Sequence, residues 1–501
     1  MPARPLRILM VSSEVESFAR TGGLGDVVLG LSRALGGRDV EVAIVTPLYG
    51  TTRIPRPAQD VHRWLGTVPA RVGWGAYDVR ECGVLEVRLE PNVRAFLVDD
   101  PALFQRDGIY GDRTGTFGDN ELRFATMSRA ALSIAERVWG GTGSDLGPDV
   151  IHAHDWHATF AILYARLSMG QAWRDVPTVF TIHNLAYQGV LGFDALDRLA
   201  LPREAYLSGQ LEQGGLVNLL KGAIVHADRV TTVSPTYAHE ILEPAGGFQL
   251  HDFLRAQSYK TAGILNGIDV RSFDPRTDGA IVANYDANDF AAGRRRCKED
   301  LFRELGLDGA DAPLFASVSR LTHQKGIDLI LAVLNNLVQA GARVALVGTG
   351  DPDLEQALYR AGGRFFGRVA TRVAFDESLA RRIYAGSDFF MVPSRYEPCG
   401  LTQMYAMRYG AIPIVTDVGG LHDSVTPYQA VREEGTGFIA HNADPLSLLI
   451  ACDEALTAYS DRQGFQRLIA RAMHRDFSWT RSADEYLDRI YRPITRLRAG
   501  L

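Results

Sequence analysis

Two cations and a carboxylate, in loops far apart in the sequence, are the residues best suited to hold a phosphorylated sugar. Arg320 and Lys325 lie in Ser319–Gly326, where a buried strand is expected to lead into a helix. Two cations there could neutralise a pyrophosphate leaving group, and Lys325 stands out because only four of the 53 basic residues are lysine. Glu397, in the turn before the expected helix Thr402–Arg408, could accept hydrogen bonds from hydroxyl groups. A solvated charge pair at a helix start would not explain two cations beside one strand end.

A glycine pair precedes the first expected helix, Leu24–Leu35. Gly22 and Gly23 would let backbone N–H groups approach an anion, and Arg20 could add a countercharge. The spacing fits neither the dinucleotide-binding fingerprint nor the P-loop. A tight packing turn is the alternative explanation. Gly419–Gly420 repeats the strand, glycine-pair and helix design later in the chain.

Two further loops carry histidines beside polar residues. His152, His154, Asp155 and His157 fall within six residues, but their order does not fit the familiar metal signature and no further carboxylate cluster completes a site. We therefore expect no metal, and favour a polar substrate rim near Asp155 or structural hydrogen bonding. His183, followed by asparagine at the tip of a buried strand, could bond sugar hydroxyls, with a purely structural histidine as the alternative.

The composition is typical of a soluble protein of two domains. A chain of 501 residues exceeds the size at which one hydrophobic core keeps growing, and 46% hydrophobic with 22% charged residues is ordinary. The net charge of −6 argues against nucleic acid or a membrane as the main partner. No run of 18 apolar residues occurs, and four scattered cysteines without C-x-x-C favour the reducing cytoplasm.

Short β-branched runs alternate with helical patterns along the whole chain, which predicts parallel sheets of βαβ units and an α/β fold. The expected strands are Ile8–Val11, Val40–Val45, Arg94–Val98, Val150–His154, Thr178–His183, Val230–Val233, Leu314–Val318, Arg343–Val347, Val369–Phe375, Phe389–Val392 and Ile412–Val415. Further expected helices are Asn120–Val138 and Ala158–Leu167. We expect doubly wound domains at 1–258 and 259–476, and a helical tail at 477–501 that packs on the first domain. Ligands of such sheets bind at the carboxyl ends of the strands.

Together these loops resemble those of the bacterial glycogen synthases and plant starch synthases, over nearly the whole chain. That family consists of retaining glucosyltransferases with the GT-B fold, in which two Rossmann-like domains face a deep cleft. The motifs that carry the resemblance are Thr21–Leu24, His154–His157, Thr181–Gly189, Thr232–Tyr237, Leu265–Asp269, Ser319–Gly326, Glu397–Gln403 and Gly419–Leu421.

The resemblance implies transfer of glucose from ADP-glucose to the 4-hydroxyl at the non-reducing end of an α-1,4-glucan. Arg320 and Lys325 would stabilise the departing diphosphate, so that no metal or other cofactor is required. Glu397 would bind glucose hydroxyls, and His183 would contact the sugar near the reacting carbon by its ring or its carbonyl. The donor-binding residues that the family implies are Arg20, Gly22, Gly23, Asp155, Asn266, Tyr396, Cys399, Gly400, Leu401 and Thr402.

The chain departs from related sequences at two positions. Arg20 stands where the family has lysine, and Tyr405 stands where related families carry a second glutamate, eight residues after Glu397. The motifs leave open the choice between ADP-glucose and UDP-glucose, and the oligomeric state. The alternatives are a retaining transferase that uses another sugar nucleotide or a small acceptor, a nucleotide-sugar epimerase of the same fold, and a glucan-binding protein without activity.

Overall fold

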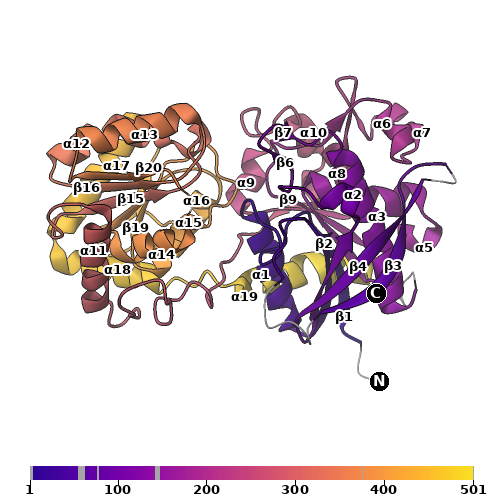
Figure 1. Ribbon diagram of the computed structural model, residues 1–501, viewed down its shortest axis with the longest axis horizontal. Coiled ribbons are helices and arrows are strands. Elements are labelled where there is room, and N and C mark those ends of the chain that lie inside the picture. The colour runs from indigo at the N-terminus through magenta and orange to yellow at the C-terminus, as the bar shows by residue number, and fades with distance from the viewer. Residues whose placement is uncertain (1–3, 55–61, 76–77, 142–146, 375, 500–501) are drawn as a thin grey trace. The chain divides into compact units, whose positions relative to one another are not determined.

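The computed structural model describes residues 4–54, 62–75, 78–141, 147–374 and 376–499. It divides into two compact units (Figure 1). Unit 1 comprises Met1–Val233, Ala238–Gly267 and Trp479–Leu501, and unit 2 comprises Ser234–Tyr237 and Ile268–Ser478.

Unit 1 is built on a nine-stranded sheet with the order β14-β13-β9-β8-β1-β2-β5-β4-β3. The strands from β14 to β5 pair in parallel, whereas β4 is antiparallel to both of its neighbours. The chain order reverses between β1 and β8, so the loops that follow these two strands lie side by side. The strands are β1 (Leu6–Val11), β2 (Val40–Pro47), β3 (His62–Arg71), β4 (Val79–Glu90), β5 (Val93–Asp99), β8 (Val150–His154), β9 (Thr178–Ile182), β13 (Arg229–Thr232) and β14 (Thr261–Gly263).

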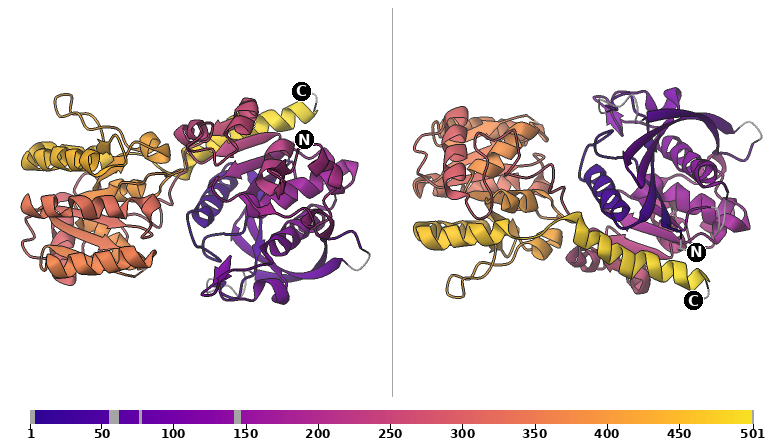
Figure 2. Two further views of the ribbon diagram at one scale, coloured as in Figure 1. Left: turned by 90° about the horizontal axis from the view of Figure 1, so that it is seen from above. Right: turned by 90° about the horizontal axis from the view of Figure 1, so that it is seen from below.

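Helices cover this sheet, and the C-terminal helices lie along unit 1 (Figure 2). Trp479, Tyr486 and Tyr491 of the tail belong to the same buried cluster as Val28 of α1. The helices are α1 (Leu24–Gly36), α2 (Pro101–Phe104), α3 (Asn120–Trp139), α4 (Thr159–Leu163), α5 (Gln171–Arg174), α6 (Ala195–Arg198), α7 (Arg203–Leu207), α8 (Leu219–His226), α10 (His251–Ala256), α19 (Trp479–Glu485) and α20 (Arg492–Ala499). The short strands are β6 (Gly111–Asp112), β7 (Gly115–Thr116), β10 (Val190–Leu191), β11 (Glu212–Gln213) and β12 (Leu216–Asn218).

Unit 2 is a six-stranded parallel sheet between helices, with the order β17-β16-β15-β18-β19-β20. This is the doubly wound order in which ligands bind where the chain order reverses, here between β15 and β18. The strands are β15 (Leu314–Val318), β16 (Arg343–Val347), β17 (Val369–Arg372), β18 (Phe389–Val392), β19 (Ile412–Thr416) and β20 (Phe438–Ala440). The helices are α11 (Ala291–Leu305), α12 (Ile327–Gln339), α13 (Pro352–Arg364), α14 (Glu377–Gly386), α15 (Thr402–Arg408), α16 (Gly419–Ser424), α17 (Pro445–Ser460) and α18 (Arg462–Met473). The helix α9 (Pro235–Glu240) begins in unit 2 and ends in unit 1.

The predicted α/β elements are confirmed, most of them within two residues at each end. The strand expected at 369–375 ends at Arg372, and residue 375 lies outside the described residues. The helix expected at 158–167 is divided into a short 3₁₀ turn, α4 and a wider helical turn. The pair β3–β4 was missed because β3 contains glycine and proline and β4 mixes charged with apolar residues, unlike the apolar runs of the parallel strands.

The division between the units falls at Gly267 and Ile268, nine residues after the expected boundary at 258. The reason is that β14 pairs with β13 and so extends the sheet of unit 1. The second division falls at Ser478 and Trp479, two residues after the expected start of the tail.

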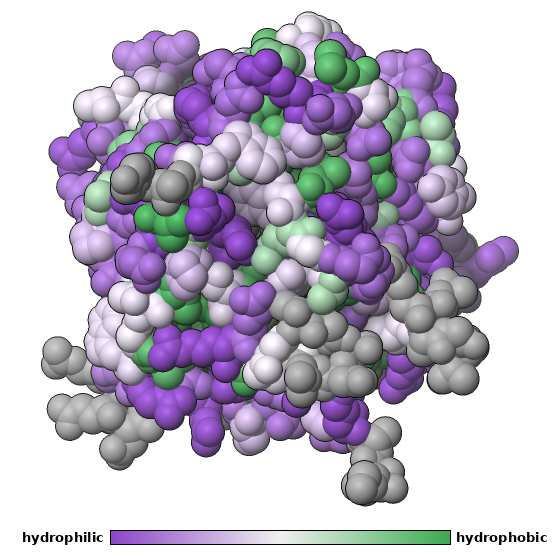
Figure 3. Space-filling model, turned by 90° about the vertical axis from the view of Figure 1, so that its right-hand side faces the viewer, coloured by the Kyte–Doolittle hydropathy of each residue, from purple (hydrophilic) through white to green (hydrophobic). Residues whose placement is uncertain are grey.

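Hydrophobic character can be described for the helices and for one face of the molecule. Among the described residues, no helix combines the length and apolar character needed to cross a membrane. On the face shown in Figure 3, hydrophobic residues are scattered among hydrophilic ones.

Candidate functional site

Lys325 lies in the loop between β15 and α12, at the point where the chain order of unit 2 reverses. A single 3₁₀ turn, His323–Lys325, ends at Gly326, whose φ of 67° is left-handed. A Cβ at Gly326 would lie 2.0 Å from the carbonyl oxygen of Pro393, so only glycine lets the loop approach the end of β18 this closely. This approach brings Lys325 to the loop that follows β18.

That loop holds Glu397, whose side chain is 8% exposed. Its Oε2 atom lies 2.5 Å from the Lys325 ammonium and accepts a hydrogen bond of 3.0 Å from Ser394 Oγ. The carbonyl of Ser394 in turn accepts a hydrogen bond of 2.5 Å from the Thr416 hydroxyl. A buried carboxylate held by a cation and a hydroxyl has one fixed orientation, which suits it to bind a ligand in a defined pose.

The two loops are also joined by their backbones. The Arg395 amide donates to the Gln324 carbonyl at 2.8 Å, and Gln324 Nε2 donates to the Tyr396 carbonyl at 2.9 Å. The Arg395 guanidinium binds both carboxylate oxygens of Asp328 at 2.7 and 2.8 Å. The β15 and β18 loops therefore form one connected structure.

Arg320 lies on the same loop as Lys325 but is exposed. Within the part of the chain that the structure describes, its guanidinium has no hydrogen-bond or ion-pair partner. Lys325 of the same loop is paired with Glu397, whereas the Arg320 guanidinium is available to bind an anionic ligand.

The turn at Glu397–Leu401 is supported from behind by the second glycine pair. The Gly420 amide donates to the Glu397 carbonyl at 3.1 Å, and a Cβ at Gly420 would lie 2.1 Å from the Cys399 carbonyl. Gly400 has a left-handed φ of 69°. The glycines after β19 therefore shape the turn that carries Cys399, rather than presenting the Gly420 amide to a ligand.

The motif at 232–237 also supports this turn, a contact that sequence reasoning did not predict. Within unit 2, Ser234 Oγ donates to the Pro398 carbonyl at 2.6 Å, and the hydroxyls of Tyr237 and Tyr396 lie 2.5 Å apart. Tyr396 is thus held by hydrogen bonds at its ring and at its backbone.

In unit 1, Glu14 organises the loop between β1 and α1. Its buried carboxylate accepts hydrogen bonds from the Thr21 amide at 2.7 Å, the Thr21 hydroxyl at 2.7 Å and the Gly22 amide at 3.2 Å. The Tyr110 hydroxyl donates to the same carboxylate at 2.6 Å. The Gly22 amide therefore donates its hydrogen bond to a carboxylate of the protein, whereas we had expected it to donate to an anionic ligand. Glu14 was missed, although its place just after β1 was a signal.

Of the other predicted donor-binding residues of unit 1, Arg20 and Asn266 have partners as well. Arg20 pairs with Asp26 of the first turn of α1, with 3.2 Å between Nε and Oδ2. Gly23 is exposed at the start of α1. Asn266 is buried near the end of β13, and its amide donates to the Val233 carbonyl at 3.3 Å.

The histidines after β8 and β9 form a hydrogen-bonded group. His152 bonds the Tyr491 hydroxyl at 2.8 Å and the Thr181 hydroxyl at 2.6 Å, and His154 Nδ1 lies 3.0 Å from His183 Nε2. Burial lowers the pKa of His152 and His183 to about 3, and it also holds the pKa of His154 well below its usual value. At neutral pH these rings are uncharged, so the His154–His183 contact is a hydrogen bond between neutral rings. The described residues contain no cluster of three or more His, Cys, Asp or Glu side chains that could bind a metal ion.

Asp155 joins the loops after β8 and β9. It has a left-handed φ of 57°, and its Oδ1 atom accepts hydrogen bonds from the amides of His183 at 2.7 Å and Asn184 at 3.3 Å. Strained backbone of this kind is often found at functional sites. Burial raises the pKa of Asp155 to about 7, against the lowering effect of the two amides. Asp155 thus fixes the backbone at His183 and Asn184.

The raised pKa of Asp155 predicts a pH-dependent contribution to stability. Between pH 3.8 and about pH 7, the folded protein holds a proton on Asp155 that the unfolded chain has lost. The stability that this proton contributes is therefore lost as the pH rises through this range. The variant Asp155→Asn has no such proton. We expect the free energy of unfolding of the parent chain to fall relative to that of Asp155→Asn between pH 5 and pH 8. Denaturant unfolding of both proteins at the two pH values measures this difference, and a constant difference would contradict the prediction.

Family models match most of the chain. The starch synthase catalytic domain model matches residues 7–256, and the model of group 1 glycosyl transferases matches residues 312–458. A glycogen synthase of Anaeromyxobacter sp. (strain Fw109-5) is 42% identical and covers 98% of this chain and 99% of its own length. A glycogen synthase of Exiguobacterium sibiricum is 39% identical with the same coverage. The catalytic domain of starch synthase IV from Arabidopsis thaliana, bound to ADP and acarbose, is similar in structure, with a TM-score of 0.88, 33% identity and coverage of 98% and 99%.

Proposed function

The chain belongs to the family of glycogen and starch synthases, and we propose that it transfers glucose from ADP-glucose to the non-reducing end of an α-1,4-glucan. The family and the GT-B fold class that the motifs indicated are confirmed by relatives that align over the full length. The observation that carries the proposed chemistry is the ion pair between Lys325 and Glu397, on connected loops where the chain order of unit 2 reverses.

On the donor side, cations balance the charge of the leaving group. When the bond between glucose C1 and the β-phosphate oxygen breaks, negative charge develops on ADP, and Lys325 with Arg320 would stabilise it. Glu397, oriented by Ser394, would accept hydrogen bonds from the glucose hydroxyls. These two cations supply the charge stabilisation, so the proposed reaction uses no metal or other cofactor.

Residues of unit 1 would orient the reacting sugar for attack by the acceptor. With retention of configuration, the acceptor 4-oxygen bonds to C1 on the face that ADP leaves, and the departing phosphate takes the proton of the hydroxyl. The low pKa of His183 makes its ring a neutral hydrogen-bonding group at pH 7, so it would bind and orient the sugar without donating a proton as a cation. Asp155 would act on the same step as a positioning residue, through the His183 amide.

Arg20 provides a test of the first glycine loop. Its guanidinium is tied to Asp26, and we propose that it contacts the donor as the family lysine would. Arg20→Lys should therefore change the KM for ADP-glucose while leaving thermal unfolding nearly unchanged. The loop would be only a packing turn if Arg20→Ala kept the donor KM of the parent chain.

One assay separates the proposed function from its alternatives. Labelled ADP-glucose and UDP-glucose are supplied in parallel, with glycogen, with maltose or with neither, and the label is measured in polymer, in oligosaccharide and in sugar nucleotide. We expect glycogen-dependent incorporation from ADP-glucose, unchanged by EDTA. A changed sugar nucleotide without glycogen would indicate an epimerase, transfer to maltose alone a small-acceptor enzyme, and no turnover a binding protein.

A location in the cytoplasm is part of the proposal. All four cysteines are buried and free, as expected for a reducing compartment.

A further inference from the structure

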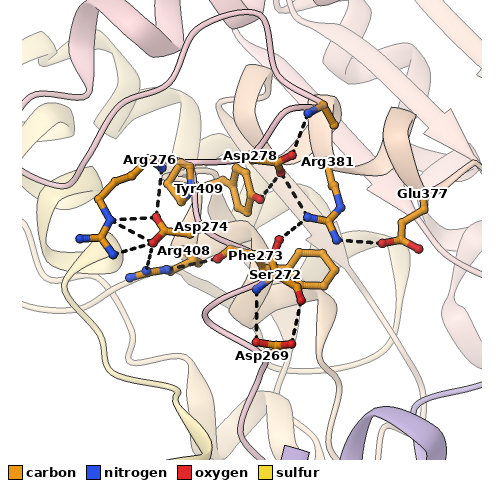
Figure 4. Close-up of polar contacts among 12 residues, drawn as sticks. Asp269, Ser272, Phe273, Asp274, Arg276, Asp278, Glu377, Arg381, Arg408 and Tyr409 are labelled. Atoms are coloured by element: carbon orange, nitrogen blue, oxygen red, sulfur yellow. Dashed lines mark hydrogen bonds and ion pairs between the residues drawn. The ribbon is translucent and has the colours of Figure 1, made fainter. Parts of the chain in front are cut away.

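The crossover segment, residues 268–290, leads from β14 to α11 and packs against α15 within unit 2 (Figure 4). The buried ring of Phe273 stacks on Tyr405, with centroids 3.8 Å apart and an interplanar angle of 24°. The guanidinium carbon of Arg381 lies 4.0 Å from the centroid of the same Phe273 ring. An aromatic ring held between a second ring and a cation is fixed in position. Tyr405, at the place of the second glutamate in related families, therefore serves to hold the crossover segment.

Two buried carboxylates of the crossover segment bind Arg408 and Tyr409 at the carboxyl end of α15. Asp278 accepts a hydrogen bond from the Tyr409 hydroxyl and pairs with Arg381 at 3.3 Å. Asp274 lies 3.4 Å from the Arg408 guanidinium. The side chains of Asp274 and Asp278 are only 7% and 4% exposed, so removing a partner would leave a buried charge poorly compensated. These contacts hold the end of α15 tightly.

The backbone at the end of α15 is bound too. The carbonyl oxygen of Tyr409, which follows the helix, accepts hydrogen bonds from the Tyr285 hydroxyl at 2.8 Å and from the Arg294 guanidinium. Terminal carbonyls of a helix lack partners within the helix, and the crossover segment with α11 supplies them here. Side chains and backbone together fix the carboxyl end of α15.

The opposite end of α15 begins at Thr402, directly after the turn that carries Glu397. A helix of seven residues is about 10 Å long and moves as one rigid element, so a shift at one end is carried to the other. We propose that Phe273 and Asp278 are positioning residues that fix the Glu397–Thr402 turn through α15. This inference rests on the proposed function, in which that turn binds the donor.

The variant Tyr409→Phe tests the proposal with little change in shape, because it removes only the hydroxyl that donates to Asp278. We expect faster amide hydrogen exchange in the peptide covering 397–402 of the full-length protein, since the helix behind it is held less firmly. In steady-state assays the KM for ADP-glucose should rise about five-fold, while the KM for glycogen stays within about two-fold. Asp278→Asn, which weakens the pair with Arg381, should act in the same direction.

Arg303→Ala is the control. Arg303 pairs with Asp300 within α11 at 2.9 Å, its side chain is 76% exposed, and an exposed pair of this kind contributes little to stability. This variant should keep the exchange rates and both KM values of the parent chain. Unchanged exchange at 397–402 in Tyr409→Phe would overturn the inference, as would equal rises in both KM values. A parent chain that transfers no glucose from ADP-glucose would instead contradict the proposed function.

Discussion

Replacement of Lys325 by alanine should lower kcat by about 10²-fold or more, because the variant loses a preorganised cation at the point where charge develops on the leaving group. The measurement is the initial rate of glucose incorporation at saturating ADP-glucose and glycogen. Near-normal turnover would contradict the role of Lys325 in stabilising the diphosphate. Lys325→Arg should recover only part of the rate, since a forked guanidinium does not reproduce a compact ammonium at the same place.

Loss of Lys325 also removes the partner of a buried carboxylate, so an effect on folding has to be separated from an effect on catalysis. Lys298 offers a matched control, because its ammonium lies 2.6 Å from Asp388 and both side chains are 12% exposed. Asp388 precedes β18, at the end of the strand opposite to the Glu397 loop. Lys298→Ala should lower the thermal unfolding temperature at least as much as Lys325→Ala, yet keep kcat near that of the parent. Equal losses of kcat in the two variants would indicate that the Lys325 effect is one of stability.

Replacement of Glu397 by glutamine should also lower kcat by about 10²-fold, because an amide is a weaker acceptor for sugar hydroxyls than a charged carboxylate. The same change leaves the Lys325 ammonium without its countercharge, although the amide oxygen could still accept its hydrogen bond. We expect the loss in kcat/KM for ADP-glucose to exceed any change in the KM for glycogen. Unchanged kinetics with ADP-glucose would contradict the assignment of Glu397 to the donor.

The double variant Lys325→Ala, Glu397→Gln tests whether the two residues act together. Residues in direct contact give non-additive effects, and groups that act as one unit in catalysis do so strongly. The double variant should therefore lose less activity than the product of the two single losses. A loss equal to that product would show that Lys325 and Glu397 act independently.

The sequence alone was sufficient to predict the parallel core of both units. Apolar strands such as Leu314–Val318 and Phe389–Val392 are buried on both faces, so they form continuous runs that are readily recognised. The β3–β4 pair lacks that pattern, and its pairing depends on contacts with β5 that are distant in sequence. The boundary at 267 was similarly hidden, because β14 is three residues long and is defined only by pairing with β13.

The sequence by itself determined which residues could do the chemistry. Its motifs also indicated the family to which the chain belongs. Only the tertiary structure decided their partners. Lys325 and Glu397 are 72 residues apart and meet because the chain order reverses between β15 and β18. The Gly22 amide looked free to bind an anion until the fold placed Glu14 against it. Residue type sets what a group can do, whereas hydrogen-bond partners and burial are set by packing between distant segments, which local sequence does not encode.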